Sequence, residues 1–183
     1  MKKNILLLFI LYLFMVIPIH AEHMKFMGIP LTGTITQFQN KLTAKSITYD
    51  KEFSSHLEAG IRAFNGVFAG EKAQIFIYYN VSTKIVYKAR VSIACENATI
   101  CSNKYETMKS MLYQKYGDKY AQTQHVYGSE NMLWKIPNAN VDAVIGNIYL
   151  SISDSYRPRY YLYIDYMDVE NYHNNERRNM NDL

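Results

Sequence analysis

The sequence lacks the residue patterns that mark catalysis, metal binding or nucleic-acid binding. Its five histidines form no His-x-x-x-His or similar metal-ligand spacing. No serine lies in Gly-x-Ser-x-Gly, no Ser-x-x-Lys precedes a helix as acyl enzymes require, and no phosphate-binding glycine loop opens a predicted helix. The formal net charge is only +4 and the basic residues are dispersed. We therefore predict no catalytic residue, no metal or cofactor, and no nucleic-acid partner.

Long hydrophobic runs are also scarce, and the only one lies at the N-terminus. Lys2 and Lys3 precede an apolar run over residues 5–19, which Pro18 interrupts, and Ala21 follows as a suitable cleavage point. These are the three parts of a secretory signal peptide. The competing interpretation is a transmembrane helix, which needs about 20 apolar residues. We predict a periplasmic or secreted protein, cleaved near Ala21, with no stable membrane insertion afterwards.

The rest of the chain fits one domain. Removing residues 1–21 from 183 leaves 162 residues and lowers the formal net charge from +4 to +2, because the removed segment holds two lysines and no acidic residue. A chain of that length can bury a core of its own. We assign residues 22–170 to a single α+β domain. Residues 171–183 are polar and asparagine-rich, and we predict a disordered or loosely docked tail.

Cysteine is limited to two residues, Cys95 and Cys101. In an oxidising compartment an even number favours a disulfide, which here would fix the connection between a strand and a helix. The competing interpretation is two unpaired thiols at the ends of neighbouring elements. A catalytic redox pair would be expected to show Cys-x-x-Cys, and that spacing is absent.

The clearest strand pattern covers residues 60–93, where three runs of alternating polar and apolar residues are separated by turns. In the second run both faces are apolar, so the sequence does not show which one is buried. The third run alternates cleanly. Its predicted buried face consists of Ile85, Tyr87, Ala89, Val91 and Ile93.

Two helices are predicted from their caps and apolar stripes. Thr34 and Gln37 fit a capping box at the start of the first helix. The second helix is expected to start after Asn103 and to end at Gly117. The two stripes are Ile35, Phe38 and Leu42 in the first helix, and Tyr105, Met108, Leu112 and Tyr116 in the second.

The order of these elements predicts the fold class. A helix is followed by three strands, and a second helix by four, which suggests two similar halves of αβββ type. An antiparallel sheet of about six to eight strands, with both main helices packed on one face, would bury the two stripes. We therefore predict an α+β fold.

Three phrases carry a resemblance: FMGIPLTGTITQFQNKL, GVFAGEKAQIFIYYN and TKIVYKARV. They are similar to a group of uncharacterised exported proteins of anaerobic Gram-negative bacteria, which implies no known activity and no catalytic residue. The helix-then-strands pattern also resembles the beta-lactamase-inhibitor-like fold. That second resemblance would imply protein binding through an exposed sheet face.

Carboxylates near the end of the last predicted strand offer one possible chemistry. Asp165, Asp168 and Glu170 suggest either a pair for glycoside hydrolysis or oxygen ligands for calcium. The odd spacing of Asp165 and Asp168 places them on opposite faces of a regular strand, however. The competing interpretation is charge in solvent at a strand end.

Aromatic residues are the most promising functional feature, with 17 tyrosines against 8 phenylalanines and 1 tryptophan. The competing interpretation is that these rings lie in the core, the usual place for strand aromatics. As a candidate binding surface we select Phe76, Tyr78, Trp134, Tyr161 and Tyr163.

These observations favour a non-enzymatic module that binds an envelope or extracellular protein or peptide. One alternative is a hydrolase acting on glycans or peptides, with Asp165 or Glu71 as its carboxylate. Another is a carrier of a small apolar ligand, which would need a cavity lined by Met108, Leu112 and Ile148.

Overall fold

The computed structural model describes residues 22–126, 129–140, 142–156 and 159–181. The predicted signal peptide therefore lies outside the described residues. The helices and strands along the chain are β1 (Lys25–Phe26), β2 (Ile29–Pro30), α2 (Ile35–Thr43), β3 (Thr48–Tyr49), α3 (Lys51–Ser54), β4 (Ile61–Phe68), β5 (Glu71–Tyr79), β6 (Val86–Cys95), α4 (Ala98–Tyr116), β7 (Ala121–Val126), β8 (Ser129–Pro137), β9 (Val144–Tyr156), β10 (Arg159–Asp168) and α5 (Val169–Asn181).

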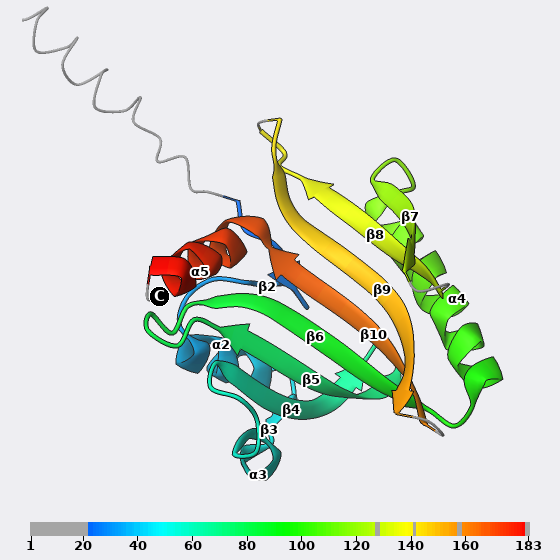
Figure 1. Cartoon of the computed structure of the whole chain (residues 1–183), viewed down its shortest axis with the longest axis horizontal. Coiled ribbons are helices and arrows are strands. Elements are labelled where there is room, and N and C mark those ends of the chain that lie inside the picture. Colours follow the sequence, from blue (N-terminus) through cyan, green and yellow to red (C-terminus); the bar gives the residue numbers. More distant parts are fainter. Residues whose placement is uncertain (1–21, 127–128, 141, 157–158, 182–183) are drawn as a thin grey trace, which may run out of the picture.

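Eight strands form one antiparallel sheet in the order β3-β4-β5-β6-β10-β9-β8-β7. The strands of the first half of the chain lie together, those of the second half lie together, and the halves meet at β6 and β10 (Figure 1). Each half is a helix followed by four strands. The first half has one strand more than the three predicted, because Thr48 and Tyr49 pair with β4. The prediction of an α+β fold with an antiparallel sheet is confirmed.

The two main helices, α2 and α4, pack on the same face of the sheet, here called the inner face. Their predicted stripes are buried in one hydrophobic core with side chains from the strands, except that Tyr116 is half-buried and packs against this core. The buried helix residues are Ile35, Phe38 and Leu42 of α2, and Cys101, Tyr105, Met108 and Leu112 of α4. Full burial of one such apolar side chain contributes roughly 1.5–3 kcal/mol. The stripes therefore hold both helices against the sheet.

The helix starts show how local sequence acts. The capping box of α2 is present: the backbone N–H of Gln37 donates to Thr34 Oγ1, and that of Thr34 donates to Gln37 Oε1. The second helix, α4, begins at Ala98, earlier than predicted, because Asn97 Oδ1 accepts a hydrogen bond from the N–H of Ile100 at 2.9 Å.

The predicted disulfide is confirmed. Cys95 is the last residue of β6, Cys101 lies in the first turns of α4, and their Cα atoms are 5.2 Å apart. The bond joins the sheet directly to the start of the helix.

The buried face of β6 differs from the prediction at its first residues. Tyr78 lies opposite Lys88 and Tyr79 lies opposite Val86, so the pairing of β5 with β6 shifts by one residue and Tyr87 is the extra residue of a bulge. Val86 is therefore buried, where the regular alternation predicted Tyr87. The ring of Tyr87 instead contacts that of Tyr78 on the opposite face of the sheet.

The C-terminal residues form the helix α5, whereas the sequence predicts a disordered or loosely docked tail from Asn171. Asp168, the last residue of β10, accepts a hydrogen bond from the N–H of Asn171 at 2.9 Å, as helix-capping residues do. The side chain of Asn171 donates to the carbonyl of Leu31 at 2.9 Å. Polar contacts of this kind leave no regular spacing of apolar residues in the sequence. The prediction, which relied on that spacing, therefore missed α5.

Candidate functional site

The outer face of the sheet, opposite α2 and α4, is bordered by the helices α3 and α5. At one border Phe53 of α3 contacts Phe76 of β5, and at the other Tyr172 of α5 contacts Tyr87 of β6. Between these borders the strands present a group of half-buried aromatic and charged side chains. They are Phe76, Tyr78, Lys88, Arg90, Tyr149, Tyr161, Tyr163 and Asp165.

Three charged side chains occupy the centre of the outer face. Arg90 of β6 and Asp165 of β10 are direct cross-strand partners. The guanidinium donates two hydrogen bonds of 2.7 Å, one to each carboxylate oxygen. Lys88 Nζ lies 3.1 Å from the same carboxylate. Because two-point arginine–carboxylate pairs are strong and fixed in orientation, this charge cluster is a rigid group with an excess positive charge.

The two cations keep Asp165 ionised. Burial by itself acts to raise the pKa of Asp165, but the hydrogen bond from Arg90 and the charges of Lys88 and Arg90 outweigh it, so the pKa is lowered. The same hydrogen bond raises the pKa of Arg90. General-acid catalysis by a carboxyl near neutral pH requires a raised pKa. Asp165 therefore does not have the property that the hydrolase hypothesis needs.

Tyrosine rings surround the charge cluster. Arg90 Cζ lies 4.9 Å from the ring centroid of Tyr163, and Lys88 Nζ lies 5.1 Å from that of Tyr78, within the range of cation–π contacts. The rings of Tyr161 and Tyr163 are nearly parallel, with centroids 6.1 Å apart. The predicted surface residues that share this face are Phe76, Tyr78, Tyr161 and Tyr163.

Trp134, the fifth predicted surface residue, does not belong to this face. Its side chain is 0% exposed on the inner face and contacts the ring of Tyr113 of α4, with centroids 5.3 Å apart. It lies opposite Ile148, another buried core residue. The prediction is wrong here because Met132, Leu133 and Trp134 are consecutive apolar residues, so alternation could not show which face each one occupies.

One part of the outer face is hollowed into a groove of about 580 Å³. Gln74 and Ser92, cross-strand partners on β5 and β6, line it together with Ala94 and Tyr161, partners on β6 and β10. The groove thus combines an amide, a hydroxyl and an aromatic ring. Such a lining offers both hydrogen bonds and apolar contact to a bound segment.

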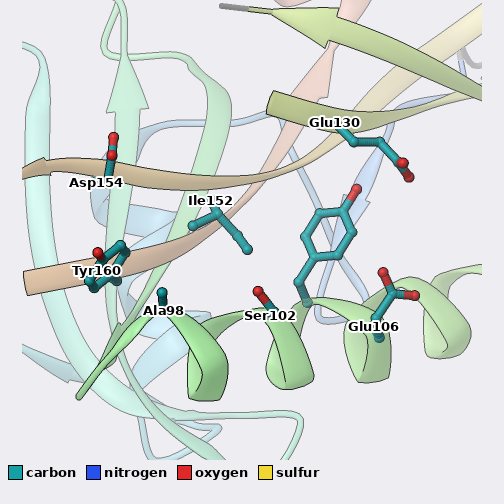
Figure 2. Close-up of a pocket in the computed structure, with 8 residues that line it drawn as sticks. Ala98, Ser102, Glu106, Glu130, Ile152, Asp154 and Tyr160 are labelled. Carbon is teal, nitrogen blue, oxygen red and sulfur yellow. The ribbon is translucent and has the colours of Figure 1, made fainter. Parts of the chain in front are cut away.

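A second cleft, of about 330 Å³, lies between α4 and the strands β8, β9 and β10 (Figure 2). Its lining residues are Ala98, Ser102, Tyr105, Glu106, Glu130, Ile152, Asp154 and Tyr160. Lys109 donates a 2.8 Å hydrogen bond to Glu130, which lowers the pKa of that carboxyl. Burial raises the pKa of the Tyr105 hydroxyl. Both shifts move the pKa values further from neutral pH, whereas groups that act in general acid–base catalysis have pKa values near it.

The other candidate carboxylates have structural partners. Asp168 faces the side of the sheet opposite to Asp165, as predicted, and is buried. Burial raises its pKa, and its oxygens accept hydrogen bonds from the N–H groups of Met24 and Asn171, both at 2.9 Å. Glu71 is paired with Lys104 of α4. Within the described ranges no group of three or more His, Cys, Asp or Glu side chains is arranged to hold a metal ion.

Fold and site together define a small α+β protein whose sheet has one face packed under two helices and one face rich in tyrosine. Comparisons with protein-family models, with curated proteins and with solved structures found no match. Among the helices of the described residues, none combines the length and the apolar character needed to cross a membrane. The resemblance to exported proteins and to the beta-lactamase-inhibitor-like fold stays a prediction.

Proposed function

We propose that this chain is an exported, non-enzymatic module that binds a protein or peptide through the outer face of its sheet. The observation that carries the proposal is the grouping of tyrosines around the charge cluster of Lys88, Asp165 and Arg90. This group lies on the outer face, opposite α2 and α4. The predicted signal peptide supports export. The disulfide is compatible with an oxidising compartment.

The composition of the outer face suits protein recognition. Tyrosine and arginine are enriched among the residues that contribute most to protein–protein affinity, because they combine large apolar area with directed polar groups. The side chains here are already held by ion pairs and ring contacts. Less side-chain entropy is lost on binding when the contacting groups are pre-organised.

The two alternative functions have less support. For the hydrolase, the Asp165 carboxylate is held in ion pairs with Lys88 and Arg90, and Glu71 is paired with Lys104. For the carrier, the residues expected to line its cavity, Met108, Leu112 and Ile148, are packed in the hydrophobic core. The outer face is therefore the surface on which we base the function.

Site-specific photocrosslinking tests this proposal. A photoreactive benzoylphenylalanine is placed at Tyr161 on the outer face, and as a matched control at Thr36, an exposed residue of α2. We expect a discrete adduct with an envelope or extracellular protein from Tyr161 alone, and its loss when Arg90→Ala is added. Identical adducts from both positions, or no adduct from Tyr161 across several growth conditions, would contradict the proposal.

A further inference from the structure

The strand β7 is the last strand of the sheet, and one of its two backbone edges is paired with β8. The N–H of Lys135 donates to the carbonyl of Tyr120 at 3.0 Å, which shows where hydrogen-bonded residue pairs fall along β7 and β8. In an antiparallel pair these hydrogen-bonding groups alternate along the strand. Gln122 and Gln124 therefore direct their backbone groups to β8, and the backbone groups of Thr123 and His125 point away from the sheet.

The outward edge of β7 carries none of the features that usually protect a sheet edge. Residues 121–126 read Ala-Gln-Thr-Gln-His-Val, with no proline, no lysine and no acidic residue. Gln122, Thr123 and His125 are exposed, and the pairing with β8 is regular along the whole strand. Natural proteins rarely leave such an edge open, because it is a template for another strand.

The opposite edge of the sheet is protected. There β3 is only two residues long, and it is followed at once by the cap residue Asp50 and the helix α3. A short edge strand and a covering helix are two of the ways in which proteins prevent unwanted pairing. The contrast marks β7 as the edge available for a partner.

We propose that the partner is a second copy of this chain, joined by antiparallel pairing of the two β7 strands about a two-fold axis at Thr123. The three residues at the centre, Gln122, Thr123 and Gln124, read the same in both directions. Pairing centred there places Thr123 opposite Thr123, Gln122 opposite Gln124 and Ala121 opposite His125. No like charges meet in this register, and the pairs of glutamine amides can hydrogen-bond across the junction.

The outward backbone groups fit the same register. The N–H and C=O of Thr123 pair with their counterparts in the second copy. The N–H of His125 donates to the carbonyl of Ala121 in the second copy. The N–H of Ala121 already donates to the carbonyl of Asp118 at 2.9 Å, so the ladder ends there. An axis perpendicular to the sheet keeps both outer faces on the same side. The dimer would therefore present two copies of the tyrosine-rich face on one continuous sheet.

Concentration-dependent sedimentation and cysteine crosslinking test this inference on the chain as it is purified after export. We expect a reversible dimer, and rapid disulfide formation between the two copies of Thr123→Cys, because directly paired residues in a sheet lie about 5.5 Å apart at Cα. The matched variant Gln122→Cys should crosslink at least roughly tenfold more slowly, because its counterpart is displaced diagonally across the junction.

A proline variant tests whether the backbone edge is the interface. Thr123→Pro removes an N–H that makes no bond to β8, so the monomer should keep its fold and circular dichroism spectrum. The dimer dissociation constant should rise at least about tenfold, because each copy loses a hydrogen bond at the axis. A chain that is monomeric at all concentrations, a dimer unaffected by Thr123→Pro, or faster crosslinking of Gln122→Cys than of Thr123→Cys would each overturn the inference. Pairing of β7 with a different protein would appear as the monomeric outcome.

Discussion

The two faces of the sheet are made by the same strands, yet they are held by different forces. On β10 the inner residues Leu162 and Ile164 are buried in the core, while the outer residues Tyr163 and Asp165 contact charged side chains of β6. The inner face is stabilised by apolar burial under the helices. The outer face is ordered mainly by ion pairs and ring contacts, which add less to stability. The inner face therefore holds the fold, and the outer face is the one on which the proposed function rests.

The largest expected effect comes from Trp134→Ala on the inner face. The side chain is fully buried against α4, so its removal leaves a cavity and should lower the free energy of unfolding by about 3–5 kcal/mol. Chemical denaturation followed by circular dichroism measures this loss. If Tyr161→Ala on the outer face destabilised the protein by as much, the contrast between the faces would not hold.

Removing the disulfide should have the next largest effect. Replacing both Cys95 and Cys101 by serine frees the connection between β6 and α4, and the lost restriction of the unfolded chain is worth about 2 kcal/mol. Thermal unfolding of the variant, compared with the wild type under oxidising and reducing conditions, measures it. The wild type should lose the same amount on reduction, and the variant should not respond to the reductant.

Asp165→Asn probes the charge cluster of the outer face. It leaves Arg90 and Lys88 without their shared counter-ion, and we expect a loss of about 1–2 kcal/mol at pH 7, because the pair is partly screened by solvent.

The sign of the pH dependence follows from the lowered pKa of Asp165. The ionised carboxylate stabilises the fold above its unfolded pKa of about 3.9, and this contribution is lost as the pH falls through the folded pKa. Urea denaturation at pH 7 and pH 3 should therefore show that the difference in free energy of unfolding between wild type and Asp165→Asn is smaller at pH 3. The same difference at both pH values would mean that the carboxylate charge does not stabilise the outer face.

The smallest effect on stability is expected for Tyr161→Ala. The ring is half-buried beside Tyr163 and lies outside the hydrophobic core, so the free energy of unfolding should change by less than about 1 kcal/mol. Binding of the partner captured by photocrosslinking should weaken at least about tenfold in the same variant. Intact binding by Tyr161→Ala would remove this ring from the recognition surface.

Much of the fold could be read from local sequence. The capping box at Thr34 and the stripe that includes Phe38 specify a helix and its buried face through contacts within a few residues. The same holds for the stop of α4 at Gly117, whose φ of +80° favours glycine. The odd spacing of Asp165 and Asp168 likewise predicted that they face opposite sides of β10. These features depend on neighbours in the chain, and the sequence therefore displays them.

The errors have one cause in common. The bulge at Tyr87 arises where β6 pairs with β5, the burial of Trp134 depends on α4, and α5 is held by side chains such as Asn171 that bond to distant backbone. Contacts between segments far apart in the chain leave no period in the sequence. The aromatic candidates were selected by composition, and composition does not record which face of a strand is covered.

By itself the sequence determined the two main helices, most of the strands and the α+β class, and it favoured the pairing of Cys95 with Cys101, because caps, periods and short loops act locally. Only the tertiary structure decided that Tyr78, Tyr161 and Tyr163 gather around the ion pair of Arg90 and Asp165. That grouping requires β5, β6 and β10 to lie side by side, and it is the order of strands in the sheet, set by packing against both helices, that brings them together.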